Sequence, residues 1–489
     1  MKPLEEVPVA IVGAGPCGLL TALLLSRAGV PCRLLEKHPG VSTHPKAMGI
    51  TRRTAEIFRQ CGILHDMMAP DFQSPDLELM IWAKSLTGEE FGRAPLPPAE
   101  ASFSPCRPFH VPQTHTETVL LNALAAEPLA CVHFEHRVTG IRQLPQGVEL
   151  DIEAPEGRKT ARAEWVVAAD GAASPIRNSL GIEADGPGDL GHFLNVFFHA
   201  DFGREMAGRR ALLYNILRED LVEFFVSVNG RDLWLMHHFL RPDQPTPDQD
   251  GLHALICSAS GLRSPHVKIL GVAPWVMSPK VASRFRENRV LLTGDAAARL
   301  SPAGGMGMNT GLQAAHNLAW KIAAVVQGAA REPLIDSYDS ERRNLALAVM
   351  RHTNENSSEV FQQVQFALQG DWQSLRASIA RSHRQAEDRS FDTDVRYGTA
   401  FRFPHAPLSS PDSSTLDLFG RGFAIVAGSQ TCLGGAGLPP ITILNSFPAG
   451  VPCGPAGAAL VRPDGFLCWA KSSDVREQDL LDALAFASR

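Results

Sequence analysis

The chain has 489 residues, 44% of them hydrophobic and 20% charged, with a formal net charge of −6. This composition is typical of a globular protein of two or three domains. The lack of a basic surplus argues against nucleic acid or an acidic membrane as a partner. Nine cysteines are scattered without a C-x-x-C pair. We therefore expect no disulfide framework and no metal site and, since no signal peptide is evident, a cytoplasmic location.

The first pattern that predicts a function runs from Val7 to Glu36. A short β-forming run leads into Gly13, Gly15 and Gly18, an apolar helical segment follows, and a second apolar run ends on Glu36. The order strand, G-x-G-x-x-G, helix, strand and acid is the dinucleotide-binding fingerprint with its context intact. Gly13 permits the tight turn, and Gly15 lets the backbone approach a pyrophosphate. The acid can then accept hydrogen bonds from ribose hydroxyls.

The segment after the ribose acid is predicted to be a loop, and it carries cations that include Lys37 and Lys46. Such cations are well placed to reach a pyrophosphate, although solvated surface charge explains any one of them equally well. Further along, Thr114 and Glu117 have the spacing of a capping box before an apolar helix. Gln113, one residue before the expected cap, is then free to contact a ligand.

A second strand–turn–helix pattern ends a buried run at Asp170 and Gly171. Acids at the carboxyl ends of strands lie where open α/β sheets bind their ligands. In 186–279, short aromatic and β-branched segments alternate with turn residues, which predicts an inserted antiparallel sheet. His237 and His238 lie on one of its strands, so alternation directs only one of them toward a pocket. Each is more typical of a half-buried strand histidine than of a catalytic base.

The third pattern begins where a strand ends at Gly294 and Asp295, and it continues through Pro302 and a glycine-rich loop into a helix expected to begin near Asn309. A helix N-terminus beside a loop without bulky side chains predicts a second bound electron-rich group. Helical sequence continues to about Ala386, and a linker and a small α/β tail follow.

Together, the three patterns resemble the FAD-dependent aromatic hydroxylases of the para-hydroxybenzoate hydroxylase class, the group A flavoprotein monooxygenases, over nearly the whole chain. The tail is similar to the thioredoxin-like C-terminal domain of phenol and aromatic-polyketide hydroxylases, although it lacks a redox C-x-x-C. The resemblance implies an α/β fold with a Rossmann-like FAD-binding domain, an inserted mainly antiparallel β-sheet substrate domain and a thioredoxin-like C-terminal domain. The expected boundaries are 1–185 and 280–403 for the FAD-binding domain, 186–279 for the substrate domain and 404–489 for the tail.

The resemblance also implies an activity. FAD would be bound without a covalent link, NADPH or NADH would be a transient electron donor, and O₂ would hydroxylate a phenolic or polycyclic aromatic substrate through a flavin C4a-hydroperoxide. The protein would be a monomer or a homodimer. Baeyer–Villiger oxygenation of a polyketide ketone uses the same fold, and no residue of the sequence separates the two reactions. A non-catalytic flavin-binding sensor is the third alternative, and the intact glycine loops argue against it.

Site residues follow from the same resemblance. Glu36 takes the adenosine ribose and Asp295 the flavin ribityl chain, whereas Gln113 and Lys46 lie along the ribityl chain and the pyrophosphate. Asp170 would hold its own turn and contribute to NADPH binding. The residues expected to contact a cofactor are Gly13, Gly15, Pro16, Cys17, Gly18, Glu36, Lys37, Lys46, Gln113, Asp170, Asp295, Gly305, Gly307, Met308 and Asn309.

Two residues are expected to act in catalysis by resemblance. The carbonyl group of Pro302 would accept a hydrogen bond from the substrate, and Arg396 would stabilise a phenolate, the alternative being an arginine on the surface. Two positions depart from the family pattern, because Lys46 stands where arginine is usual and Ala298 where many members have histidine. The candidate substrate contacts are His237, Tyr214, Pro302 and Gly304.

Overall fold

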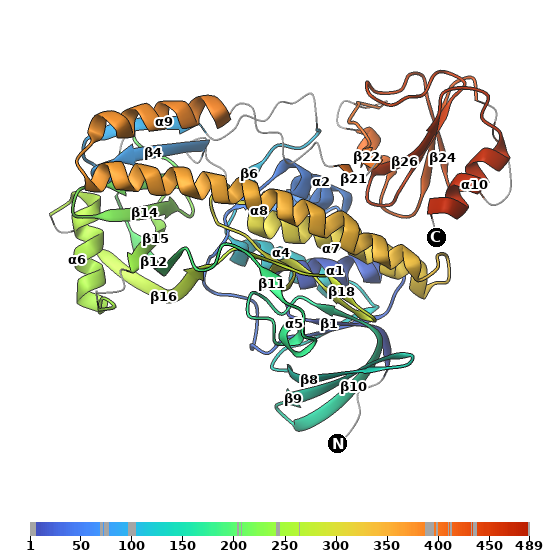
Figure 1. The fold of residues 1–489 in the computed structure, drawn as a ribbon, viewed down its shortest axis with the longest axis horizontal. Helices are drawn as coiled ribbons and strands as arrows, with labels where there is room; N and C mark the ends of the chain where they lie inside the picture. The colour runs from blue at the N-terminus through green and yellow to red at the C-terminus, as the bar shows by residue number, and fades with distance from the viewer. Residues whose placement is uncertain are drawn as a thin grey trace.

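The computed structural model describes residues 6–68, 72, 78–95, 104–202, 205, 206, 208–240, 245–263, 265–386, 396, 397, 400–408, 410, 413–431, 433 and 438–487. Figure 1 shows three regions: a central part, a seven-stranded sheet on the left, and a C-terminal domain on the right. A long helix, α8 (Pro333–Leu368), runs from the seven-stranded sheet along the central part.

The central part is built on a mainly parallel sheet with the order β18-β19-β10-β1-β2-β7. Strand β1 (Val7–Val12) pairs in parallel with β2 (Cys32–Leu35) and with β10 (Gly157–Ala168). Helix α1 (Pro16–Arg27) joins β1 to β2 and is buried along most of its length. Strands covered on both faces need nearly continuous apolar runs, which explains the composition of β1 and β2.

The remaining elements of this part surround the sheet. Helices α4 (Gln113–Ala125) and α7 (Met306–Val326) pack against α1. The others are β3 (Gly49–Ile50), α2 (Arg52–Gln60), α3 (Leu64–Met67), β6 (Phe109–His110), β7 (Ala130–His133), β8 (Arg137–Leu144), β9 (Gly147–Ala154), α5 (Pro175–Ser179), β11 (Ala184–Asp185), β17 (Lys280–Ala282), β18 (Arg286–Glu287), β19 (Val290–Leu292) and β20 (Ala298–Arg299).

The seven-stranded sheet has the order β16-β12-β15-β14-β13-β4-β5. Its strands are β4 (Leu79–Ala83), β5 (Glu90–Pro95), β12 (Gly191–Ala200), β13 (Leu213–Leu217), β14 (Val222–Ser227), β15 (Leu233–Leu240) and β16 (Val267–Met277). Helix α6 (Gln249–Ser260) contributes to the core on one face, and α8 with α9 (Trp372–Ala386) covers part of the other. Strands β4 and β5 were not expected in this sheet: β4 pairs in parallel with β13, about 130 positions later, a pairing with no local sequence signal.

The C-terminal sheet has the order β21-β22-β26-β25-β23-β24. Its strands are β21 (Arg396–Tyr397), β22 (Ala400–Arg402), β23 (Ala424–Gly428), β24 (Ile441–Leu444), β25 (Ala458–Val461) and β26 (Phe466–Lys471), and α10 (Glu477–Ala487) packs on it. The sheet thus begins before residue 404. Among the described residues, no helix combines the length and the apolarity that a membrane span needs.

Candidate active site

The loop between β1 and α1 has the shape that its glycines require. Gly13 has a φ of +106°, and a Cβ there would lie 2.3 Å from the carbonyl oxygen of Ala169. A Cβ on Gly18 would lie 1.9 Å from the carbonyl oxygen of Gly13, so only glycine lets α1 approach β1 this closely. At Gly15, by contrast, no atom lies within 4 Å of where a Cβ would be. The backbone at Gly15 therefore faces open space into which a pyrophosphate can fit.

Glu36 follows β2 at the carboxyl end of the parallel strands, where ligands bind in such sheets. Its Oε2 accepts a hydrogen bond from the amide of Ala14 at 2.8 Å, and Oε1 accepts one from the amide of His38 at 2.9 Å. These bonds hold the carboxylate in place and leave lone pairs for ribose hydroxyls. Lys37, the next residue, is exposed.

Cys17 packs between the first glycine loop and the Gly294–Asp295 turn. A Cβ on Gly311 would lie 2.5 Å from its Sγ, and a Cβ on Gly294 would lie 3.0 Å from it. Burial, together with the charges of Asp295 and Glu117, raises the pKa of the Cys17 thiol far above its usual value. The side chain is therefore an apolar spacer between two motifs that lie far apart in the sequence, and the contact of Cys17 with a cofactor stays a prediction.

The carboxylate of Asp295 is accessible to solvent, yet the protein atoms around it are numerous enough to raise its pKa. Its side chain is accessible to solvent, and no partner for it is found among the described residues. The surrounding protein nevertheless raises its pKa by burial, while Lys46 and Arg299 act in the opposite direction. A carboxylate that is accessible yet enclosed by protein atoms lines a recess, and its free oxygens are available to the hydroxyls of a ligand.

Helix α7 begins at Met306, earlier than expected, with Gly305 as its N-cap at φ +66°. The amides of Met306, Gly307 and Met308 lie in the first turn and have no partner within the helix. No atom lies within 4 Å of a Cβ placed on Gly305 or Gly307. The loop therefore presents free amides and a positive helix end to open space, which suits an anionic edge of a flavin.

The side chain of Asn309 is not part of this surface, so its expected cofactor contact stays a prediction about its backbone. It is fully buried, its Oδ1 accepts from the amide of Thr51 at 2.9 Å, and its Nδ2 donates to the carbonyl oxygens of Gly49 and Gly305 at 2.9 and 2.8 Å. Asn309 instead joins α7 to the loop beside β3. Because the helix starts three residues before it, the free amides belong to the preceding residues.

The expected capping box at Thr114 and Glu117 is wrong. The N-cap of α4 is Pro112, and Thr114 lies inside the helix. Glu117 accepts hydrogen bonds from Nε2 of Gln113 at 2.7 Å and from the amide of Ser42 at 2.8 Å. Gln113 is thus not free, because its amide nitrogen is held by Glu117. The pattern misled because a carboxylate three residues after a threonine can also bond to a distant loop.

Asp170 has a structural role in its turn. Its Oδ1 accepts from Oγ of Ser174 at 2.6 Å, and its Oδ2 accepts from the amide of Ile176 at 3.1 Å. Arg177 donates to the carbonyl oxygen of Ala296 at 3.2 Å, which joins this turn to the one that contains Asp295. The part of Asp170 in NADPH binding stays a prediction.

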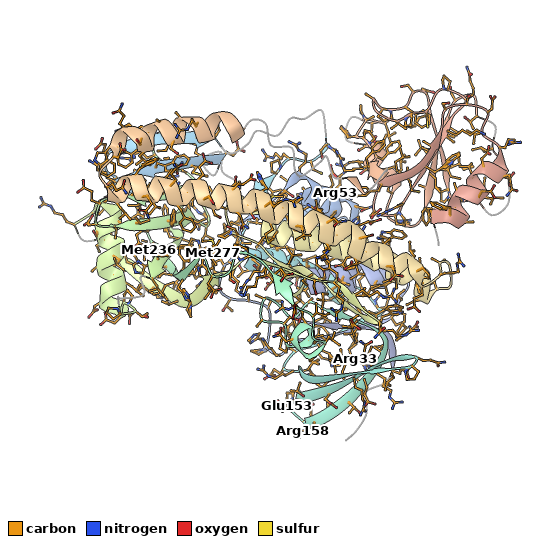
Figure 2. All side chains as sticks on the ribbon, in the orientation of Figure 1. Arg33, Arg53, Glu153, Arg158, Met236 and Met277 are labelled. Atoms are coloured by element: carbon orange, nitrogen blue, oxygen red, sulfur yellow. The ribbon has the colours of Figure 1, made fainter. Side chains whose placement is uncertain are left out.

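Pro302 and Gly304 are both exposed, next to the start of α7. The carbonyl oxygen of Pro302 accepts a hydrogen bond from the amide of Gly305 at 3.0 Å, and its second lone pair is available to a substrate. Ser301 bonds to Ser357 of α8 and donates to Sδ of Met277 at 3.5 Å. Figure 2 shows Met277 at the edge of the seven-stranded sheet that meets the central part. This loop therefore lies where the sheet, α8 and the central part meet.

The two adjacent histidines of β15 point to opposite faces of the sheet. Nδ1 of His238 lies 2.7 Å from Oε1 of the buried Glu223. His237 lies on the other face, edge-on to Trp275 with their ring centroids 6.1 Å apart. Burial, and to a smaller degree the neighbouring His44, lowers the pKa of His237 to about 4. His237 is therefore neutral at physiological pH.

Tyr214 does not contact the site, which corrects its proposed role in substrate binding. It is 1% exposed and belongs to the core on the α6 face. Its hydroxyl donates to the carbonyl oxygen of Arg209 at 2.9 Å and accepts from the amide of Ala211 at 2.6 Å. Alternation along β13 directs the neighbouring Asn215, and not Tyr214, to the face of His237.

Several polar residues on that face were not predicted from the sequence. Asn195 and Asn215 are 6% and 4% exposed, and an amide atom of each has no partner. His44, in the loop after Glu36, packs edge-on against Phe197 with ring centroids 6.0 Å apart. A single amide within an otherwise apolar strand was the available signal, because burying it without a partner is costly.

Arg396 lies in β21, the edge strand of the C-terminal sheet, on the opposite side of Figure 1 from the seven-stranded sheet. Its side chain lies outside the described residues. Its role therefore stays a prediction.

Comparison with known proteins agrees with the expected FAD-binding site. The family model described as an FAD binding domain matches residues 6–353. The chain is 31% identical to tetracenomycin A2 monooxygenase-dioxygenase of Streptomyces glaucescens, covering 95% of this chain and 93% of that protein. It is 31% identical to 4-methyl-5-nitrocatechol 5-monooxygenase of Burkholderia sp., covering 99% and 98%. The solved structure of the flavin-dependent monooxygenase PieE in complex with FAD and substrate superposes with a TM-score of 0.90 at 26% identity, covering 99% of both chains.

Proposed function

Because the chain belongs to the FAD binding domain family and is an FAD-dependent aromatic monooxygenase, we propose that it uses NADPH or NADH and O₂ to hydroxylate a polycyclic phenol. When bound, FAD would take two electrons from the nicotinamide donor and activate O₂, one atom of which would enter the ring as a hydroxyl while the other leaves as water. The protein supplies binding, orientation and exclusion of water.

One observation carries the proposal: the two glycine-rich motifs, which meet at Cys17, each leave open backbone. Gly15 faces open space in the first motif, Gly305 and Gly307 in the second, and Cys17 holds the two motifs in contact. Glu36 and Asp295 stand beside these loops with carboxylate oxygens for hydroxyl groups. This arrangement fits a long molecule with a ribose near one end, phosphates and a ribityl chain in the middle, and a flat ring near the α7 N-terminus.

The residues around the ring end have separate tasks. The amides of Met306 to Met308 stabilise negative charge that develops on the flavin ring. The carbonyl group of Pro302 orients a substrate hydroxyl through its free lone pair. The stacked Phe193 and Trp275, whose ring centroids lie 4.6 Å apart, form part of an aromatic wall that limits water. Arg396 is proposed to stabilise a phenolate from the edge of the C-terminal sheet.

The test begins with the purified protein. Denaturation should release one FAD per chain, and NADPH oxidation should accelerate when an aromatic substrate is added. With ¹⁸O-labelled O₂, mass spectrometry should find one labelled oxygen as a ring hydroxyl. Label in a lactone or ester would identify Baeyer–Villiger chemistry instead. NADPH oxidation that no phenol or polycyclic phenol stimulates would contradict the proposal.

A further inference from the structure

Four side chains lie in register across the seven-stranded sheet. Asn195 of β12 pairs with His237 of β15, His237 with Phe224 of β14, and Phe224 with Asn215 of β13. Residues paired in this way lie on one face and form a row perpendicular to the strands. The row is polar at both ends and aromatic in the middle. We call these four residues the cross-strand row.

The row lies on the face that meets the central part. Met48 packs with Leu235 and Val228 in one cluster, and His44 contacts Phe197, so the loop that contains Lys46 borders this face. On the other side, Nε1 of Trp82, the β4 residue paired with Asn215, donates to Gln363 of α8 at 2.9 Å. The cross-strand row therefore lies between the loop that contains Lys46 and α8.

The polar atoms of the row lack partners, although its two amides are more than nine-tenths buried. Oδ1 of Asn195, Nδ1 of His237 and Nδ2 of Asn215 have no hydrogen-bond partner, and the same holds for Nε2 of His44 and Nε1 of Trp275 next to them. A buried polar group without a partner costs about 1–3 kcal/mol. Because several such atoms lie on one face of the sheet, we infer that a bound ligand forms hydrogen bonds with them.

The polar side chains of the cross-strand row, and His44 and Trp275 next to them, are neutral. The pKa of His237 is lowered to about 4, and burial lowers the pKa of His44, to which the charge of Lys46 adds while the neighbouring Asn195 side chain acts in the opposite direction. The row therefore offers neutral donors and acceptors. Neutral amides and imidazoles recognise hydroxyl and carbonyl oxygens without the charge that would favour a carboxylate.

Strand spacing sets the length of the ligand. Neighbouring strands lie about 4.8 Å apart, so His237 and Asn215, two strands apart, are separated by roughly 10 Å, with Phe224 between them. A benzene ring is too short to reach both positions, whereas three or four fused rings lying over Phe224 can reach them. Aromatic stacking on Phe224 adds to the hydrogen bonds at the two ends.

We propose that the cross-strand row is the specificity-determining site for the substrate, and that it selects a neutral molecule of three or four fused rings with oxygen functions at both ends. This inference rests on the proposed function, since it specifies the substrate of the same reaction. The hydrogen bonds at His237 and at Asn215 select the length of the ligand, and we call this effect the ruler. A ligand that reaches only one of the two residues leaves buried polar atoms at the other without hydrogen bonds.

The test measures binding to the oxidised, FAD-loaded enzyme by the change in flavin absorbance, so it needs neither turnover nor NADPH. The probes are 2,6-dihydroxyanthraquinone, whose hydroxyls lie at opposite ends of the ring system, anthraquinone without hydroxyls, and phenol. Wild-type enzyme should bind 2,6-dihydroxyanthraquinone about tenfold more tightly than anthraquinone. His237→Phe, which keeps an aromatic ring, and Asn215→Leu should each weaken binding of 2,6-dihydroxyanthraquinone about five- to tenfold. His192→Phe, on exposed β12 surface, is the matched control and should match wild type.

The outcomes separate the two proposals. If wild-type enzyme hydroxylates an aromatic substrate but the His237 and Asn215 variants bind 2,6-dihydroxyanthraquinone like wild type, the row is not the specificity site although the proposed function stands. Weaker binding of phenol in both His237→Phe and Asn215→Leu would contradict the ruler, because a single ring reaches only one of the two ends. Failure of wild type to bind either anthraquinone would overturn the substrate class. A change confined to the KM for NADPH would assign the row to the nicotinamide donor instead.

Discussion

The central part meets its two neighbours through opposite kinds of polar contact. Toward the C-terminal domain, the buried charged groups are paired, although two neutral atoms beside them, Oδ1 of Asn317 and Nε1 of Trp320, have no partner. The 7% exposed Arg462 donates to Asp464 at 2.9 Å and to Glu341 of α8 at 2.6 Å, and the buried Lys321 of α7 donates to Glu341 at 2.8 Å. Toward the seven-stranded sheet, the buried groups of the cross-strand row are neutral and carry unpartnered atoms.

This difference indicates that the junction with the C-terminal domain holds the structure together, whereas the junction with the seven-stranded sheet binds a ligand. Arg53 of α2 donates to the carbonyl oxygen of Asp464 at 2.7 Å, and Figure 2 shows Arg53 beside the C-terminal domain. Although burial opposes it, Asp464 and Glu341 raise the pKa of Arg462. Charges that satisfy one another hold two domains together and leave nothing for a ligand. Buried neutral polar groups without a partner in the protein are stabilised only when a ligand or a water molecule supplies their hydrogen bonds.

The largest expected effect tests the charged junction. Arg462→Met leaves Asp464 and Glu341 buried with fewer partners, so the free energy of unfolding should fall by about 3–5 kcal/mol. Urea denaturation at neutral pH measures the loss. The matched control is Arg476→Met, since Arg476 is 81% exposed and lies 3.8 Å from Asp479, and such surface pairs contribute about 0–1 kcal/mol. Equal losses of unfolding free energy in both variants would show that the buried ion pairs of Arg462 contribute no more than a surface pair.

The next effect concerns the recess between the junctions. Asp295→Ala removes an accessible carboxylate without opening the core, so FAD should bind roughly 10- to 150-fold more weakly while the protein stays folded. Fluorescence titration of the apoprotein with FAD gives the dissociation constants. Asp185→Ala, at an exposed strand position, serves as control. Wild-type affinity in the Asp295 variant would remove this residue from the flavin site.

A smaller effect tests the neutral junction through pH. Folded His237 has a pKa of about 4 against an ordinary 6.5, so the unfolded chain takes up a proton in this window while the folded chain does not. Stability is therefore lost as pH falls from 6.5 toward 4. In His237→Phe this loss should shrink by about 1–2 kcal/mol, a value reduced from the full shift because the side chain is only half-buried. Urea unfolding at both ends of the window, with His192→Phe alongside, measures it.

The smallest expected effect concerns Arg396. Arg396 is proposed to act on a phenolate by its charge alone, and one charge at about 4 Å in water contributes about 1 kcal/mol. Arg396→Met should lower hydroxylation a few-fold and release more hydrogen peroxide per NADPH consumed. A peroxide assay beside product analysis checks both, and unchanged coupling would show that Arg396 does not act at the site.

The sequence alone determined the parts of this protein whose signals are local. The glycines at 13, 15 and 18 and the acid at 36 predicted the nucleotide loop, because tight turns and close approach of backbone admit only glycine. Alternation in β15 predicted that His237 and His238 face opposite ways. The Asp170 and Asp295 motifs were likewise found from short patterns at strand ends.

Only the tertiary structure decided what depends on pairing between distant segments. Glu117 had the spacing of a cap, but it bonds to Ser42 from another loop. Asn309 stood at an expected helix start, but α7 begins earlier and the side chain bonds to Thr51. The cross-strand row exists because four strands lie in one register, and a slip of one residue would turn each side chain to the other face. Register is set by sheet packing, which no local run of residues encodes.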